Sequence, residues 1–149
     1  MTRFVTFAVV LLVAATAAAQ TTPAQKAPAP TPKAFAPLQG TWVLTGPEGQ
    51  PLMPDGELAC VNTGDKYAQT VNGEVNETGT IKLDPATKPM AIDLIIADGQ
   101  DGGKTQLGVI EVTGDTLKGA LSVPGETLRP TGFAAGEGII AFVGKKKGK

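Results

Sequence analysis

From Leu38 onward, short runs of alternating apolar and polar residues are separated by glycine, asparagine, aspartate and proline. Residues 90–96 show this best, since Met90, Ile92, Leu94 and Ile96 share one face. A period of two indicates a strand with one buried face. No stretch carries a helical period, so the pattern predicts an antiparallel all-β domain.

The pattern predicts eight strands, joined mostly by short turns. The expected strands are residues 41–45, 57–62, 66–71, 74–83, 90–97, 105–113, 116–123 and 139–145. Asn72-Gly73 suits a two-residue type I′ hairpin turn, whose central residues both need positive φ, and Gly114-Asp115 indicates a second hairpin. Sequential strands are therefore expected to be neighbours.

Each of these strands has one apolar face, and the faces need a common interior. Eight antiparallel strands with short turns can close into a small up-and-down barrel, with a two-sheet β-sandwich as the alternative. Residues 124–138 are rich in glycine and proline and are expected to form a loop before the closing strand. The expected core includes five apolar side chains, which are Trp42, Leu44, Ile92, Leu94 and Leu117.

The amino terminus has the pattern of a signal peptide. Arg3 is followed by an apolar run over residues 4–19, which is short for a bilayer span of about 20 residues. The small residues that end at Ala19 predict cleavage before Gln20, and no cysteine follows for lipid attachment. We expect an exported protein, periplasmic or extracellular, with no membrane as a partner after cleavage.

Three further segments follow the expected signal peptide. Residues 20–37 form a Pro/Ala-rich linker, residues 38–145 the barrel domain, and residues 146–149 a basic tail. Removal of the signal peptide takes Arg3 with it and leaves 12 Lys and Arg against 14 Asp and Glu, which gives a net charge of −2. Because the tail is the only basic cluster, nucleic-acid binding is not expected. We expect a monomer.

The composition argues against an enzyme. The chain contains no histidine, which excludes Ser/His/Asp and Cys/His mechanisms, and a single cysteine, Cys60, which excludes an intramolecular disulfide. Gly102-Gly103-Lys104-Thr105 lacks the first glycine of a phosphate loop, and the Asp98–Gly102 turn lacks the carboxylates of a calcium loop. We expect no catalytic residue, metal or cofactor.

Several motifs resemble, in order and at compatible spacing, a family of lipocalin-like domains from exported planctomycete proteins. They are Leu38-Gln39-Gly40-Thr41-Trp42, Gly64-Asp65-Lys66-Tyr67, and residues 79–85, 88–94, 114–117 and 129–133. The resemblance implies an exported barrel of uncharacterised role and supplies no catalytic residues. The chain departs from it at residues 58–61 and at Gly144-Lys145, where the family commonly has arginine.

Gly40-Thr41-Trp42 also matches the G-x-W opening of lipocalins, in which a cation packs over the tryptophan at the barrel floor. The resemblance therefore implies that Trp42 plugs the floor against Arg129 or Lys145. Two functions remain open. The domain either carries a small apolar ligand in its interior, or it is a solid barrel that binds a protein partner through its surface.

Overall fold

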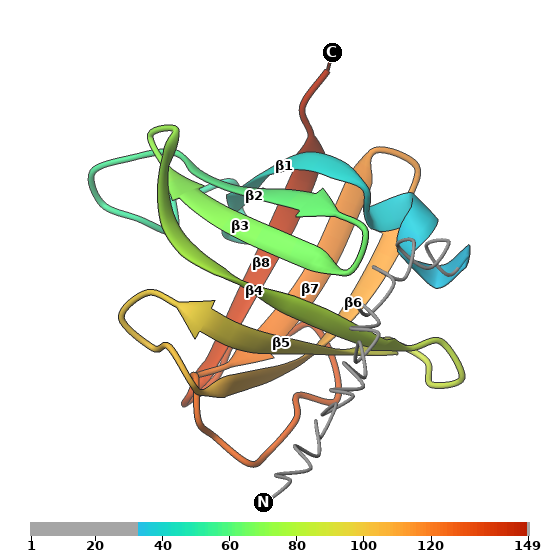
Figure 1. Ribbon diagram of the computed structural model, residues 1–149. Helices are drawn as coiled ribbons and strands as arrows, with labels where there is room; N and C mark the ends of the chain where they lie inside the picture. The colour runs from blue at the N-terminus through green and yellow to red at the C-terminus, as the bar shows by residue number, and fades with distance from the viewer. Residues whose placement is uncertain (1–32, 149) are drawn as a thin grey trace, which may run out of the picture.

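The computed structural model describes residues 33–148 and shows eight strands preceded by one short 3₁₀ helix (Figure 1). The elements are η1 (Lys33–Leu38), β1 (Gly40–Thr45), β2 (Leu58–Thr63), β3 (Lys66–Val71), β4 (Glu74–Asp84), β5 (Met90–Asp98), β6 (Thr105–Thr113), β7 (Thr116–Ser122) and β8 (Ile139–Lys146). All eight predicted strands are present, and their ends differ from the prediction by at most one residue.

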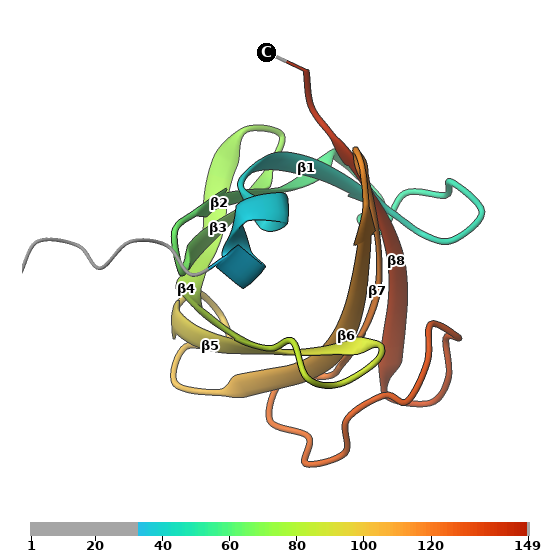
Figure 2. The same cartoon turned by 90° about the vertical axis from the view of Figure 1, so that its right-hand side faces the viewer.

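The strands close into an antiparallel barrel in which each strand pairs with its neighbours in sequence. Pairing of β1 with β8, from Trp42 opposite Lys146 to Thr45 opposite Val143, completes the ring. Figure 2 looks along the barrel axis and shows the sheet as a closed wall. The up-and-down barrel is confirmed, and the alternative of two separate sheets is not what the chain forms.

The period of two places side chains inside or outside the barrel as predicted. Met90, Ile92 and Leu94 face the interior, where Ile92 lies opposite Gly108 on β6. The five expected core side chains are all buried in one cluster, together with Phe35, Leu38, Tyr67, Ile81, Ile110, Leu121 and Phe142. Burial of this apolar surface is the main favourable term that holds the domain together, since it has no disulfide.

The domain begins before the expected boundary at residue 38. Helix η1 spans residues that we expected in the Pro/Ala-rich linker, and it lies across one mouth of the barrel (Figure 2). Phe35 and Leu38 are buried in the core cluster, and these two apolar anchors explain why the segment packs. The expected signal peptide, its cleavage site at Ala19 and Gln20, and residues 20–32 lie outside the described residues.

The long loop between β7 and β8, residues 123–138, packs on the outer wall of the barrel. Beneath it runs a row of small outward-facing side chains in register across four strands, namely Ala91, Val109, Ala120 and Ala141, all buried. Pro130 of the loop is buried, and Phe133 lies against Lys118 on β7. The barrel thus has a small outer core besides its interior.

The β3–β4 hairpin provides a test of the predicted turn. Asn72 and Gly73 have φ of 52° and 85°, and a Cβ added to Gly73 would meet no atom within 4 Å. Any loss of stability on Gly73→Val therefore reflects backbone strain. We expect Gly73→Val to lower the free energy of unfolding by about 1–2 kcal/mol. Gly73→Asn should cost less, because asparagine adopts positive φ more readily.

Urea unfolding of the wild type and both variants measures this difference. Equal losses for valine and asparagine would contradict a turn that depends on positive φ at residue 73.

Candidate functional site

The barrel interior and a cleft on its outer wall are two hollows that could receive a ligand, and two further surface hollows of about 320 Å³ lie within the β7–β8 loop and beside the β6–β7 turn. The interior hollow has a volume of only about 50 Å³. It is lined mainly by apolar side chains of the core, with three polar or sulfur-bearing groups, Cys60, Asn62 and Gln69. Pockets for small organic ligands usually measure about 300–1,000 Å³, so this space admits little more than water.

Side chains occupy even the gaps that inward-facing glycines leave. The Phe142 ring fills the space beside Gly119, its partner across β7 and β8, so that no side chain would fit there. Leu121 likewise occupies the space beside Gly108. The interior is therefore filled by close packing, as in an ordinary protein core.

Trp42 closes the mouth of the barrel on which η1 lies. Its side chain is completely buried, and its Nε1 donates a hydrogen bond to the carbonyl oxygen of Leu38 at 2.9 Å. Asn62 donates to the same carbonyl through Nδ2, also at 2.9 Å. These two bonds fix the end of η1 against β1 and β2. The structure thus places Trp42 at the barrel floor.

The cation over Trp42 is Lys146, so the expected partners Lys145 and Arg129 were both wrong. Lys146 Nζ lies 5.5 Å from the indole ring, because Lys146 is opposite Trp42 in the β1–β8 register. Lys145 precedes it by one residue and therefore points to the outside of the sheet. Arg129 lies in the loop outside the wall, separated from Trp42 by the sheet itself.

A small polar group lines the interior between β2, β3 and β4. Cys60 Sγ lies 3.2 Å from Asn62 Oδ1, and the Tyr67 hydroxyl donates to Glu77 Oε1 at 2.8 Å. Sequence reasoning missed the Tyr67–Glu77 pair. A bulge in the β3–β4 pairing beyond Gln69 sets the face on which Glu77 lies, and simple alternation does not reveal it.

This polar group is not arranged for nucleophilic chemistry. Burial, with a smaller contribution from the Glu77 charge, raises the pKa of the Cys60 thiol to about 12, so it stays protonated. Burial also raises the pKa of Glu77, although the hydrogen bond from Tyr67 opposes that shift. Burial and the bond to Glu77 raise the pKa of Tyr67 as well. These groups satisfy one another and stabilise the interior.

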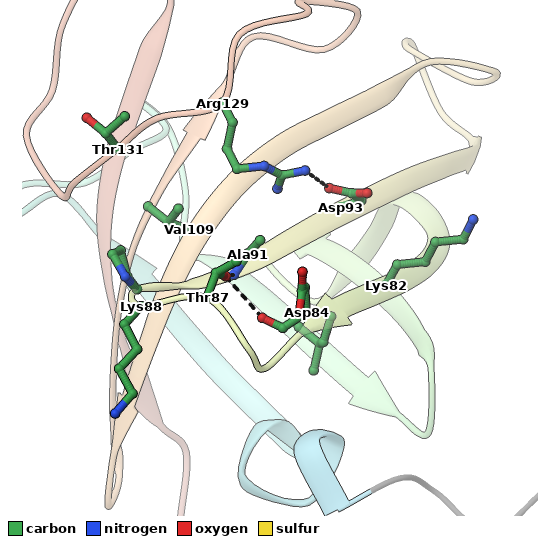
Figure 3. A pocket seen from close by; sticks show the side chains of 11 residues that line it. Lys82, Asp84, Thr87, Lys88, Ala91, Asp93, Val109, Arg129 and Thr131 are labelled. Carbon is green, nitrogen blue, oxygen red and sulfur yellow. Dashed lines mark hydrogen bonds and ion pairs between the residues drawn. The ribbon is translucent and has the colours of Figure 1, made fainter.

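The larger hollow is a cleft of about 480 Å³ on the outer wall, between the β4–β5 loop and the β7–β8 loop (Figure 3). Its apolar lining consists of Leu83, Pro89, Ala91 and Val109. Charged and hydroxyl groups surround these residues, namely Lys82, Asp84, Thr87, Lys88, Asp93, Arg129 and Thr131. This volume falls within the usual range of ligand pockets.

Arg129 holds the loop side of the cleft in place. Its guanidinium donates at 2.9 Å to the backbone carbonyls of both Ile92 and Gly108, and at 2.6 Å to Asp93 Oδ1. Charge-assisted bonds of this kind are stronger than neutral ones. Arg129 thus anchors the loop to β5 and β6. Its guanidinium is already engaged in these three hydrogen bonds.

The other polar groups of the cleft lie on its rim and in the loops beside it. Figure 3 shows the Lys82 and Lys88 side chains pointing away from each other and out of the cleft. Thr87 is bonded within its own loop, to Asp84 and to the Ala91 amide. Thr131 is exposed on the opposite rim. The cleft therefore presents an apolar floor with a rim of both charge signs.

Within residues 33–148, no group of histidine, cysteine, aspartate and glutamate side chains could hold a metal ion, and no helix is long and apolar enough to cross a membrane. Comparisons with protein-family models, curated proteins and solved structures found no match for this chain.

The burial of Trp42 predicts a large loss of stability on its removal. We expect Trp42→Ala to lower the free energy of unfolding by about 3–5 kcal/mol, because it deletes a buried aromatic ring and leaves a cavity. Trp42→Phe keeps most of the apolar volume and loses the bond to Leu38, so it should cost less. Denaturant unfolding measures both, and a loss below about 1 kcal/mol for Trp42→Ala would contradict the barrel-floor role.

Proposed function

We propose that the protein is an exported, non-enzymatic binding module whose solid barrel serves as a scaffold, and that it binds a polypeptide partner in the outer cleft. The observation that carries this proposal is the contrast between an interior hollow of about 50 Å³ and an outer cleft of about 480 Å³. Of the two functions left open by the sequence, the filled interior favours the protein-interaction module over the carrier.

The lining of the cleft supports a polypeptide as the partner. An apolar side chain of a peptide can pack on Leu83 and Pro89, which are half-buried, while its backbone and charged groups meet the polar rim. Interfaces between proteins combine an apolar centre with a polar rim in the same way. The scaffold is rigid here, because Arg129 fixes one wall of the cleft to the barrel.

The absence of catalytic equipment supports a binding role rather than an enzyme. The chain has no histidine, and its one thiol is held protonated by burial. Export rests on the amino-terminal pattern of residues 1–19. A lipocalin-like identity is supported by Trp42 at the barrel floor with Lys146 over its ring, as the G-x-W motif implies.

Binding of an apolar fluorescent probe distinguishes the solid barrel from the carrier. We expect the wild type to show no saturable binding of 1-anilinonaphthalene-8-sulfonate or of a long-chain fatty acid, because the interior lacks room. Phe142→Ala enlarges the hollow and should admit a small apolar molecule such as benzene, as engineered cavities do. Saturable binding of a fatty acid in the interior of the wild-type barrel would overturn the solid-barrel proposal.

Site-specific cross-linking tests the cleft itself. We expect a photo-reactive residue in place of Lys88, on the rim, to form an adduct with a polypeptide from the exported fraction. A second change, Thr131→Trp, narrows the cleft and should abolish that adduct. The control is the same photo-reactive residue in place of Gln100, which lies in the exposed β5–β6 loop. An adduct that survives Thr131→Trp, or that forms equally from position 100, would contradict binding in the cleft.

A further inference from the structure

The exposed charges of the barrel are sorted between its two ends. Because each strand pairs with its sequence neighbours, successive turns alternate between the ends. One end carries η1, the β2–β3 and β6–β7 turns, the β4–β5 loop and the end of β8, and we call it the basic end (Figure 2). Its exposed lysines are Lys33, Lys66, Lys82, Lys88, Lys145, Lys146 and Lys147. They outnumber its three aspartates, Asp65, Asp84 and Asp115, by four.

The opposite end is acidic. Its loops carry seven carboxylates, which are Glu48, Asp55, Glu74, Asp98, Asp101, Glu126 and Glu137, whereas Glu57 pairs with Lys147 of the basic end at 3.5 Å. The cation there is Lys104, which pairs with Asp101 at 2.8 Å. On the wall, Arg129 pairs with Asp93, and Lys118 lies opposite Glu111 in register, whereas Glu77 accepts a hydrogen bond from Tyr67. A chain of small net charge therefore forms a strong electric dipole along the barrel axis.

The lysines of the basic end are available to an anionic partner. Lys33, Lys82, Lys88 and Lys145 have no ion-pair partner within residues 33–148. Lys147 has only an exposed pair with Glu57 at 3.5 Å, and exposed pairs of this kind are weak. Lys66 bonds the Thr80 hydroxyl and Lys146 lies over Trp42, and neither forms an ion pair within residues 33–148.

We propose that the basic end docks on the surface of a bilayer that contains anionic lipid. The lysines are spread over several turns of one end of the barrel, which fits an extended charged surface better than a single small anion. The acidic end is repelled by the same surface, so the dipole sets one orientation. Each lysine near such a surface increases the membrane-binding constant about fivefold.

The basic end shares Lys82 and Lys88 with the rim of the outer cleft, whereas its other lysines do not line the cleft. The inference goes beyond the proposed function and rests on the distribution of charge, so it does not depend on that function.

Co-sedimentation of the purified exported protein with vesicles tests the proposal. We expect binding to phosphatidylcholine vesicles that contain phosphatidylglycerol, none to phosphatidylcholine alone, and release in about 1 M salt, where the Debye length falls to about 3 Å. The variant Lys66→Glu/Lys33→Glu/Lys145→Glu should weaken binding by at least about 100-fold, the product of about fivefold for each lysine lost.

The control reverses lysines away from the basic end, Lys104→Glu/Lys118→Glu, and should retain most of the binding. All five positions are exposed, and thermal unfolding by circular dichroism confirms that both variants fold. Equal binding to phosphatidylcholine alone, or equal weakening by both variants, would overturn the proposal. It would also fall if soluble polyglutamate bound more tightly than the vesicles, or if sedimentation velocity without vesicles showed copies of the chain associating end to end.

Discussion

Pairing between β1 and β8 is the contact on which the rest of the structure depends. It converts a row of hairpins into a closed wall and removes both free edges of the sheet. The same register brings Lys146 over the ring of Trp42, and the indole in turn bonds the end of η1 through Leu38. The floor of the barrel, its covering helix and its last strand are therefore held together through Trp42.

Closure also explains why the interior is filled. The domain has no disulfide and no histidine-based metal site, so its stability must come from apolar burial inside a narrow ring of eight strands. Phe142 occupies the space beside Gly119, and the buried Tyr67 donates a hydrogen bond to the half-buried Glu77. Space for a ligand in the interior would remove packing that the fold needs. The wall and the ends of the barrel are the surfaces that remain accessible.

The sequence predicts the strands and the barrel well because local rules determine them. Alternation assigns faces, and Asn72-Gly73 specifies a turn that the backbone angles confirm. Local rules do not predict which side chains meet when the answer depends on the exact register of a strand or on a contact between distant residues. Lys146, and not Lys145, faces Trp42, because a shift by one residue reverses the face of a strand.

The candidate site was largely hidden from the sequence for the same reason. The β7–β8 loop has no periodic pattern, so nothing local indicates that it lies over Ala91 and Val109 or that Arg129 bonds Asp93. The cleft exists only because this loop returns to the wall. Helix η1 was also missed, because its prolines and alanines resemble a linker, and only Phe35 and Leu38 tie it to the core.

The connectivity of the ring also sets an order on its formation. Seven of the eight strand pairings join neighbours in sequence and can form as local hairpins, whereas Trp42 and Lys146 are brought together from opposite ends of the domain. During synthesis the growing sheet therefore keeps two open edges until the residues of β8 have appeared. Contacts between distant parts of a chain form slowly, and open edges invite pairing with other chains. The molecule is thus most vulnerable to aggregation just before its last strand arrives.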